Sequence, residues 1–317
     1  MNAATPSPGR AIVKFRLAGG AQPLILLPAI VNDHGPCEFI LDTGAGTSLL
    51  SSELAKQLEV KIVGTKEGLS AGGKVSISLA KIDSLAVGQA KLDDVDVGIV
   101  DLSDIGKTIG AKIDGDLGYN FLKHFRLTID YRDCDIRFDD PKRLENFGPS
   151  AETEVPIRLA NPAKPLILVD VHANGRGPFQ FAIDTGASTT IITPELAKSL
   201  NVDSSPIGSL TTGGTHVAAS AGVLQSFMVG GAHLDNMQVV AADFFVMLSN
   251  VVGVKLDGIV GYNFLRNFRI VIDYPNEILS LLPRKWGQKN WPKKMGSDLQ
   301  GVLPKSSLLG KNSTQKR

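Results

Sequence analysis

Two short stretches of the chain place an aspartate at the end of an apolar run. FILDTGAGTSLL occupies residues 39–50 and FAIDTGASTTII occupies residues 181–192. The two aspartates, Asp42 and Asp184, are 142 positions apart. A carboxylate at the end of a buried strand costs free energy unless the site binds or uses it. If the fold brought two such carboxylates together, they could share one proton and act as an acid–base pair.

Other stretches of the chain are also written twice, at nearly the same separation. The matched pairs are SSELAKQLEV (51–60) with TPELAKSLNV (193–202), and DGDLGYNFLKHFRLTIDY (114–131) with DGIVGYNFLRNFRIVIDY (257–274). The first pair keeps the offset of 142, whereas the second has an offset of 143. We expect the extra residue in a loop, because loops vary most in length. The repeat predicts two homologous domains.

The repeat also suggests where the domains begin and end. Domain 1 would span residues 12–140 and domain 2 would span residues 154–283. Residues 1–11 would form an N-terminal segment, residues 141–153 a linker, and residues 284–317 a basic tail. The short linker favours pairing of the two copies within one monomeric chain. The alternative is that each copy pairs in a separate homodimer and the linker is a tether.

Each copy has the pattern of a mainly β domain. Short runs rich in Val, Ile and Leu are separated by Gly, Asn, Asp and Pro. We predict one helix in each copy, at Ser52–Leu58 and at Pro194–Leu200, with Thr193 as the N-cap of the second. A further helical turn would begin at Tyr119 or Tyr262.

The composition is that of a folded protein with no bulk attraction to nucleic acid. Of the 317 residues, 43% are hydrophobic and 21% are charged, and the formal net charge is +1. The charge is uneven, because residues 284–317 carry +8 and the rest of the chain carries −7. We interpret this tail as a solvated segment, with contact to an anionic partner or membrane surface as the alternative. The five histidines show no metal-ligand spacing, so we expect no metal and no cofactor.

The number of cysteines and the length of the apolar runs give information about the cellular compartment of the protein. Only Cys37 and Cys134 are present, which is too few for a disulfide framework, although they could be neighbours on adjacent strands. No run of about 18 apolar residues occurs, so we expect no membrane span. The first ten residues do not have the regions of a signal peptide. We expect a soluble protein that is either cytoplasmic or exported (periplasmic or secreted) with its signal absent from this chain.

The motifs of the two copies, taken together, resemble one known family. Each copy has an apolar run, Asp-Thr-Gly-Ala, a hydroxyl residue and a later apolar-Gly pair. The last two features are Ser48 with Leu117-Gly118 in the first copy and Thr190 with Val260-Gly261 in the second. This combination resembles the retropepsin-like aspartic peptidases, the clan that includes pepsin. The resemblance implies two homologous retropepsin-like β-barrel domains in a bilobal, pseudo-two-fold structure.

By this resemblance, Asp42 and Asp184 would form one catalytic dyad, with one aspartate from each domain. Two carboxylates held about 3 Å apart share one proton, because ionising both is costly. The ionised partner would accept a proton from a water that attacks the peptide carbonyl, and the protonated partner would stabilise the tetrahedral centre. The expected activity is that of an aspartic endopeptidase acting on an extended polypeptide.

The resemblance also assigns supporting roles to the residues after each aspartate. Thr43 and Thr185 would lock the two loops together through hydroxyl-to-backbone bonds. Gly44 and Gly186 would let the backbones approach closely, as only glycine can.

The next residue is alanine in both copies, Ala45 and Ala187. A Ser or Thr there, as in pepsin-like enzymes, could donate a hydrogen bond to the ionised carboxylate and lower the pKa of the dyad. Alanine cannot donate this bond. We therefore predict a pH optimum that is milder than that of pepsin.

Two glycine-bearing stretches, residues 68–78 and 209–220, have the pattern of hairpins that could cover a site. Their tips, the candidate flap residues, would be Gly72, Gly73, Gly213 and Gly214. Backbone groups at these tips could bind substrate as an added strand, or the glycines could form two ordinary turns. None of the four tyrosines lies in these stretches, which favours a retropepsin-like flap over a pepsin-like one.

One position breaks the symmetry of the repeat, since Asp116 in the first copy corresponds to Ile259 in the second. Both are candidates for lining a substrate subsite. Asp116 could favour a basic substrate residue, or it could be a solvated or arginine-paired carboxylate. Asp114 and Asp257 occur in both copies, and we interpret them as structural acids of a turn.

The alternative function is a catalytically inactive peptide-binding or dimerisation module with the same fold, because fold alone does not establish activity. Two intact Asp-Thr-Gly-Ala segments favour catalysis, since a pure binding module could lose one acid without cost.

Overall fold

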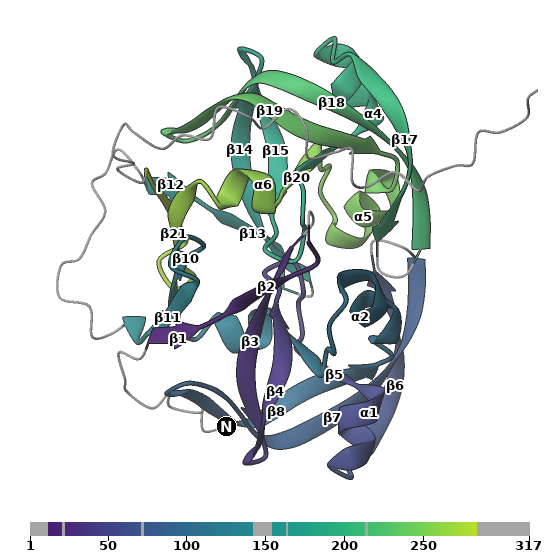
Figure 1. Cartoon of the computed structure of the whole chain (residues 1–317), viewed down its shortest axis with the longest axis vertical. Helices are drawn as coiled ribbons and strands as arrows, with labels where there is room; N and C mark the ends of the chain where they lie inside the picture. Colours follow the sequence, from purple (N-terminus) through teal and green to yellow (C-terminus); the bar gives the residue numbers. More distant parts are fainter. Residues whose placement is uncertain are drawn as a thin grey trace, which may run out of the picture. The chain divides into compact units, whose positions relative to one another are not determined.

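Strands dominate both copies of the repeat. The computed structural model describes residues 12–20, 23–70, 73–141, 154–162, 164–212 and 215–283 (Figure 1). The described residues lie within one compact unit of the chain. They form two similar β-rich halves, as the sequence predicts.

The elements follow the same order in the two halves. The first half contains β1 (Ile12–Lys14), β2 (Arg16–Ala18), β3 (Leu24–Val31), β4 (His34–Leu41), β5 (Leu49–Ser51), α1 (Ser52–Gln57), β6 (Ile62–Ser70), β7 (Gly73–Val87), β8 (Ala90–Val100), α2 (Ser103–Ile109), β9 (Gly115–Leu117), α3 (Tyr119–Leu122), β10 (Arg126–Asp130) and β11 (Asp135–Asp139). The second half contains β12 (Glu154–Pro156), β13 (Arg158–Asn161), β14 (Lys164–Ala173), β15 (Arg176–Ile183), β16 (Ile191–Ile192), α4 (Pro194–Ser199), β17 (Ser204–Thr212), β18 (Thr215–Val229), β19 (Ala232–Ala242), α5 (Phe245–Val252), β20 (Gly258–Val260), α6 (Tyr262–Leu265), β21 (Phe268–Asp273) and β22 (Ile278–Pro283).

Each half is built on an 8-stranded sheet of the same topology. The strand order is β2-β3-β4-β9-β5-β8-β7-β6 in the first half and β13-β14-β15-β20-β16-β19-β18-β17 in the second. In each sheet the short strand near the middle, β9 or β20, runs parallel to the strand that precedes the aspartate. The two sheets therefore present their Asp-Thr-Gly segments in the same local setting.

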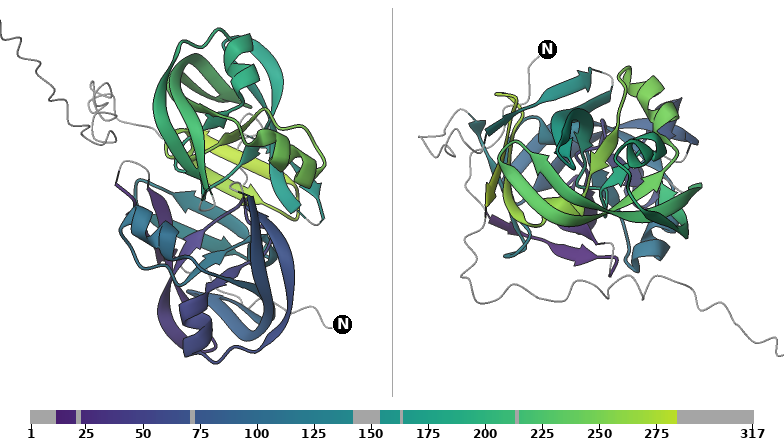
Figure 2. Two further views of the ribbon diagram at one scale, coloured as in Figure 1. Left: turned by 90° about the vertical axis from the view of Figure 1, so that its right-hand side faces the viewer. Right: turned by 90° about the horizontal axis from the view of Figure 1, so that it is seen from above.

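A 6-stranded antiparallel sheet joins the halves, in the order β1-β11-β10-β21-β22-β12. Its central pair consists of β10 from the first half and β21 from the second. Figure 2 shows β21 and β22, in yellow, between the blue and green halves. The two copies thus pair within one chain, and the alternative of a tether between two separate homodimers is not the arrangement that this structure adopts.

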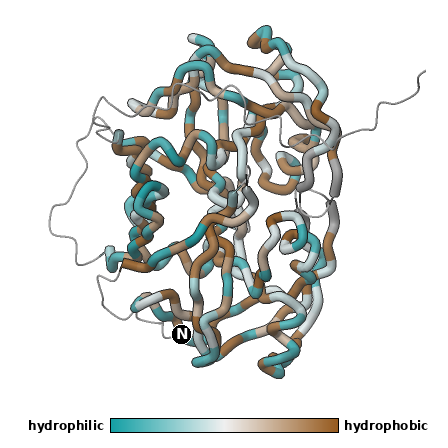
Figure 3. The backbone as a smooth tube through the Cα atoms, in the orientation of Figure 1, coloured by the Kyte–Doolittle hydropathy of each residue, from teal (hydrophilic) through white to brown (hydrophobic). Residues whose placement is uncertain are grey.

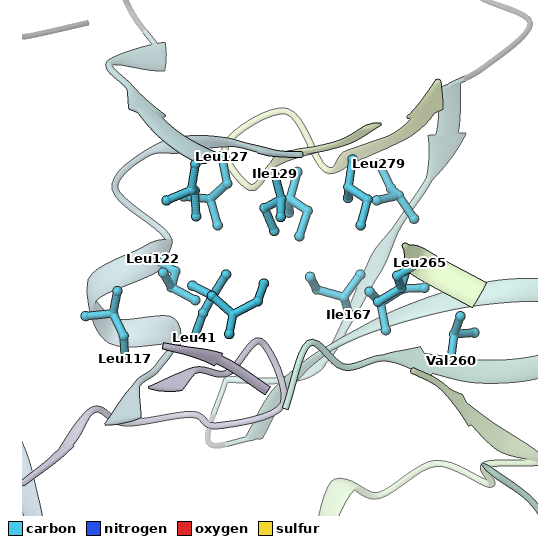
Figure 4. Close-up of a cluster of buried hydrophobic side chains, with 14 of the residues drawn as sticks. Leu41, Leu117, Leu122, Leu127, Ile129, Ile167, Val260, Leu265 and Leu279 are labelled. Carbon is cyan, nitrogen blue, oxygen red and sulfur yellow. The ribbon is translucent and has the colours of Figure 1, made fainter. Parts of the chain in front are cut away.

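The hydrophobic core is continuous between the halves. Buried side chains of both copies belong to one cluster that includes Leu41, Leu127, Ile167, Val260 and Leu279. Figure 4 shows Leu127, Ile129 and Leu279 of the 6-stranded sheet facing Leu41, at the end of β4, and Ile167 of β14. Figure 3 shows hydrophobic and hydrophilic stretches alternating along the strands, as expected for sheets with one buried face. The aspartate loops therefore rest on shared apolar packing.

The predicted helices are confirmed, and their caps explain where they begin. The Ser51 side chain accepts a hydrogen bond from Leu54 N at the start of α1, and Thr193 accepts one from Leu196 N at the start of α4 (both 3.0 Å). Helical turns also begin at Tyr119 and Tyr262, as α3 and α6.

The sequence pattern missed two further helices, α2 and α5. The helix α2 has 7 residues and α5 has 8, whereas the preceding strands, β8 and β19, correspond at the unchanged offset of 142. The extra residue of the second copy therefore lies in or beside a helix. The expectation that a loop holds it was wrong.

Both predicted hairpins are present. β6 pairs with β7 up to Ser70 and Gly73, and β17 pairs with β18 up to Thr212 and Thr215. Of the candidate tip residues, Gly73 is the first residue of β7. The others, Gly72, Gly213 and Gly214, lie outside the described residues, so the flap assignment stays a prediction.

Two expectations from composition can be compared with the structure. Cys37 and Cys134 are both free thiols, so the possible disulfide between them is not formed. Within the described ranges, the helices are too short or too polar to cross a membrane. The basic tail at residues 284–317 lies outside the described residues.

Candidate active site

The two Asp-Thr-Gly segments begin at equivalent strand ends. Asp42 directly follows β4, and Asp184 directly follows β15. The Asp42 N–H donates to the carbonyl of Leu117 at 3.2 Å, and the Asp184 N–H donates to the carbonyl of Val260 at 3.1 Å. These bonds continue the parallel pairings of β4 with β9 and of β15 with β20. The position of each aspartate is thus set by backbone bonds to a buried strand.

The threonines join the two segments by four reciprocal hydrogen bonds. Thr43 Oγ1 donates to the carbonyl of Ile183 and accepts from Thr185 N, both at 3.1 Å. Thr185 Oγ1 donates to the carbonyl of Leu41 at 2.8 Å and accepts from Thr43 N at 3.1 Å. Both threonine side chains are buried. Each half therefore satisfies polar groups of the other, as predicted for these residues.

The glycines permit the close approach of the two aspartates. A Cβ atom added to Gly44 would lie 2.8 Å from Cγ of Asp184, and one added to Gly186 would lie 2.7 Å from Cγ of Asp42. Real Cβ atoms do not approach other heavy atoms so closely. Any other residue at either position would push the opposite carboxyl away.

The two carboxyls are close neighbours, because each lies against the glycine of the opposite loop, and the charge of Asp42 acts on Asp184. Asp42 Oδ1 also accepts from Gly44 N at 2.7 Å and Ala45 N at 3.0 Å. Asp184 Oδ1 accepts from Gly186 N at 2.7 Å. Both aspartates keep partial exposure, so a small molecule or a polypeptide could contact them. Two partly exposed carboxyls, one from each half, therefore lie close together.

Two opposing effects act on the pKa of Asp184. Desolvation raises it well above the usual range, and the nearby Asp42 carboxylate raises it further. Backbone hydrogen bonds from Gly186 and Ala187 lower it. The net effect is upward, which favours a proton on the pair near neutral pH.

In each half, a serine or threonine and an asparagine form hydrogen bonds that hold the aspartate loop to neighbouring backbone. These bonds are called the brace below. Asn120 Oδ1 accepts from Ser48 N at 2.7 Å and from Ser48 Oγ at 2.9 Å, and the Asn120 amide donates to the carbonyl of Asp96 at 2.8 Å. Ser48 Oγ in turn accepts from Gly118 N at 3.0 Å. The loop is thereby tied to both β8 and the turn after β9.

The second half repeats this brace with Thr190 and Asn263. Asn263 Oδ1 accepts from Thr190 N, and Thr190 Oγ1 accepts from Gly261 N at 3.2 Å. The two hydroxyl residues were recognised in the sequence motif, whereas the two asparagines were not. The signal was present in the shared GYNFL, where an asparagine occupies the same position of each copy.

The four tyrosines form two aromatic pairs that cross between the halves. Tyr119 packs against Tyr274, and Tyr131 packs against Tyr262, both with edge-on rings. The hydroxyls of Tyr131 and Tyr274 are buried and have no hydrogen-bond partner among the described residues. Burial raises the pKa of both phenols, and the charge of the aspartates contributes. These uncharged phenols add apolar surroundings to the diacid.

The two residues that break the repeat symmetry occupy equivalent places. Asp116 is the middle residue of β9, and Ile259 is the middle residue of β20. Ile259 packs in an apolar cluster of its half. Asp116 is only 7% exposed, and in the sheet register it pairs with Ile40, two residues before Asp42. The interpretation of Asp116 as a solvated or arginine-paired carboxylate was therefore wrong.

Asp114 and Asp257 lie beside the site without joining it. Asp114 Oδ2 accepts from Glu38 N at 2.9 Å, and Asp257 Oδ2 accepts from Gln180 N at 3.0 Å. These bonds fix the start of β9 and β20 against the neighbouring strands, which fits a structural role. The described part of the chain contains no group of three or more His, Cys, Asp or Glu side chains placed to hold a metal ion.

Comparison with protein families agrees with this geometry. The model of the family described as aspartyl protease matches residues 27–121 and 169–264, which are more than half of the chain. The chain belongs to the aspartyl protease family. The family model matches once in each copy, and each match contains one Asp-Thr-Gly-Ala segment and one apolar-Gly pair. The predicted resemblance to two fused retropepsin-like domains is thereby confirmed. No curated protein matches this aspartyl protease chain.

Proposed function

We propose that the chain is an aspartic endopeptidase in which Asp42 and Asp184 act as one catalytic dyad. The observation that supports this most strongly is the close approach of the two carboxyls, which come from separate copies of the repeat and each lie against the glycine of the opposite loop. The threonine bonds and the close approach of the glycines keep the carboxyls at this spacing. A diacid that shares one proton can supply both a base and an acid in one step.

The proposed reaction uses water as the nucleophile. The ionised carboxylate takes a proton from the water as the water oxygen bonds to the peptide carbonyl carbon, and the protonated carboxyl donates its proton to the carbonyl oxygen. The tetrahedral intermediate then loses a proton from its hydroxyl to the dyad, the C–N bond breaks, and the nitrogen takes up a proton. The dyad returns to its starting protonation state.

The substrate would be an extended polypeptide. Strands β6–β7 and β17–β18 form long antiparallel hairpins, one in each half. A substrate strand could bind to backbone groups near their ends. Residues 12–140 and 154–283 would be the two domains of a monomeric enzyme, with one dyad between them.

The test is cleavage of an unfolded protein between about pH 3 and pH 8, with native chain, Asp42→Asn and Asp184→Asn. We expect either single variant to lose at least about three orders of magnitude in kcat/KM, because one amide cannot share the proton. Asp93→Asn, which changes an exposed carboxylate, is the matched control. Pepstatin, as a transition-state mimic, should inhibit the native chain and protect it against unfolding.

The outcomes separate catalysis from binding. Full loss in both single variants supports one shared dyad. A native chain that is folded and inert over the whole pH range, yet binds peptide, would instead support the inactive peptide-binding module.

A further inference from the structure

Asp116 lies on an otherwise apolar face of the first half. In the sheet register it pairs with Ile40 of β4 and with Leu49 of β5, so the three side chains share a face. Ile40 belongs to a buried apolar cluster of the first half, and Leu49 packs against that cluster. The equivalent residue, Ile259, pairs with Ala182 and Ile191, which belong to the apolar cluster of the second half. An isoleucine would suit the position of Asp116, and a carboxyl there needs an explanation.

The only charged groups found to act on the Asp116 carboxyl, among the described residues, are other carboxyls. Asp42 follows Ile40 by two residues and so lies on the same side of the sheet as Asp116. The charges of Asp42 and Asp184 both act on Asp116. Two other acids of the same sheet form ion pairs away from Asp116. Glu38 of β4 pairs with Arg16, and Asp114, which directly precedes β9, pairs with Lys112. The Oδ1 atom of Asp116 has no hydrogen-bond partner in the described part of the chain.

These surroundings decide the protonation of Asp116. An ionised Asp116 would be a buried anion beside two further acids, with no described cation to compensate it. Desolvation, and then the charges of Asp42 and Asp184, raise the pKa of Asp116 well above its usual range. A protonated carboxyl has one O–H donor, and the neighbouring Asp42 carboxylate can accept from it.

We propose that Asp116 stays protonated in the working enzyme and donates a hydrogen bond to Asp42, which places the charge of the dyad on Asp42 and its proton on Asp184. This proposal rests on the dyad function proposed above. Asp116 acts through Asp42 and is therefore a positioning residue. It keeps its own proton throughout the reaction, so the balance of the hydrolysis does not change.

The proposed bond compensates for a donor that the dyad lacks. Neither Ala45 nor Ala187 can donate a side-chain hydrogen bond to the aspartates. Asp116 would supply one such bond on the Asp42 side, whereas Ile259 supplies none on the Asp184 side. The two halves are nearly symmetric in backbone, so this one residue would decide which aspartate acts as the base and which as the acid. A neutral Asp116 gives no preference for a basic substrate residue.

The acid limb of the pH profile of kcat/KM tests the proposal. This limb reports protonation of the ionised aspartate, and a hydrogen bond to the ionised form lowers its pKa. In Asp116→Ile, which installs the residue of the other half, loss of the donor raises that pKa. We expect the limb to move about one unit toward higher pH. In Asp116→Asn the amide N–H still donates, so the limb should stay within about 0.3 units of the native profile.

Ile259→Val is the matched control, since it alters the same position of the other half without adding a polar group. It should leave the acid limb unchanged. If Asp116 is ionised instead, both Asp116 variants remove a negative charge and the limb moves toward lower pH in both, which overturns the proposal. A fall in kcat that is equal in both Asp116 variants, with no shift of the limb, would show that the residue only fills space and would also overturn it.

A second measurement does not depend on turnover. Infrared difference spectra of the native chain at neutral pH should contain a protonated-carboxyl band that is lost in Asp116→Ile and in Asp116→Asn. Its absence from the native spectrum would overturn the proposal even if cleavage were normal. If the band is present and the native chain is inert, the protonation of Asp116 is supported while the proposed endopeptidase function fails, so the two failures are distinguishable.

Discussion

At the residue scale, the site depends on a few buried polar atoms that have no alternative partners in the fold. The hydroxyl of Thr43 donates one hydrogen bond to the second half and accepts one from it, and the hydroxyl of Thr185 does the same with the first half. The two loops are therefore joined by bonds in both directions. Removing one hydroxyl leaves a buried N–H and a buried carbonyl without a bond. Unmade buried hydrogen bonds of this kind are more costly than the net gain from making them.

Thr43→Val should therefore lower the free energy of unfolding by about 2–4 kcal/mol, because Thr185 N and the carbonyl of Ile183 lose their partner. We also expect a loss of at least tenfold in kcat/KM, since the carboxyls would no longer be held at one spacing. Urea unfolding and peptide cleavage measure the two effects. Thr43→Ser, which keeps the hydroxyl, should cost only about 1 kcal/mol for the lost methyl group. Equal losses in both variants would contradict this account.

The alanine after each Asp-Thr-Gly gives a second prediction at this scale. Ala45→Ser adds a hydroxyl beside Asp42, the aspartate proposed to carry the charge, and a bond from this hydroxyl favours the singly ionised dyad. The acid limb of the kcat/KM profile should then move toward lower pH by about 0.5–1 unit. Ala45→Gly adds no donor and should leave the limb in place. A native optimum near that of pepsin, about pH 2, would remove the basis of this prediction.

At the element scale, short strands and turns carry more of the site than the long hairpins do. β9 and β20 have 3 residues each, yet each is paired with two neighbouring strands and each provides the carbonyl that holds an aspartate N–H. The turns that follow them begin with a glycine and carry the brace asparagines, Asn120 and Asn263. The aspartate loop, β9 or β20, and the following turn thus form one hydrogen-bonded unit in each half.

Asn120→Ala should loosen this unit in the first half only. Ser48 N and Ser48 Oγ would lose their acceptor, with an expected cost of about 1–3 kcal/mol in the free energy of unfolding. Asn120→Asp keeps an acceptor oxygen for Ser48 and should retain more of the stability than alanine does. Thermal unfolding together with kcat measures the outcome. A larger loss in Asn120→Asp than in Asn120→Ala would contradict the brace.

At the scale of the whole molecule, the two halves share their central sheet, their core and their ion pairs. Across β10 and β21, Arg126 faces Asp273 and Arg269 faces Asp130, at 3.9 Å and 3.0 Å. The carboxylates are nearly buried. The arrangement is reciprocal, with each half contributing one arginine and one aspartate. Separating the halves would expose the shared core and leave buried charges unpaired.

We therefore expect the two halves to unfold together. Scanning calorimetry of the native chain should give one transition whose calorimetric and van 't Hoff enthalpies agree. Arg269→Met, which removes the ion pair between Arg269 and Asp130, should lower the transition temperature without splitting it. Two separate transitions in the native chain would show that the halves are independent domains, despite their shared sheet.

Local sequence patterns were enough to predict the repeat, the mainly β character, the capped helices and the two aspartates. These features follow from local patterns, because a repeated motif, a period of two along a strand or a capping residue before an apolar run is visible without tertiary contacts. Even the pairing of the copies within one chain was favoured by the short linker. The roles of Thr43 and Thr185 came from the resemblance to a family and not from any local pattern.

The contacts of the polar residues near the aspartates could not be predicted from local patterns, because they depend on the tertiary fold. Asn120 and Asn263 act on loops about 70 positions earlier in the chain, and the tyrosine pairs join residues of opposite halves. Helices α2 and α5 have no side-chain cap among their described bonds, so the sequence lacked the signal that revealed α1 and α4. Asp116 is the clearest case. Its type suggested a solvated surface carboxylate, yet its place in β9 buries it against Asp42, because the register of a sheet, and not the polarity of one residue, fixes which side chains share a face.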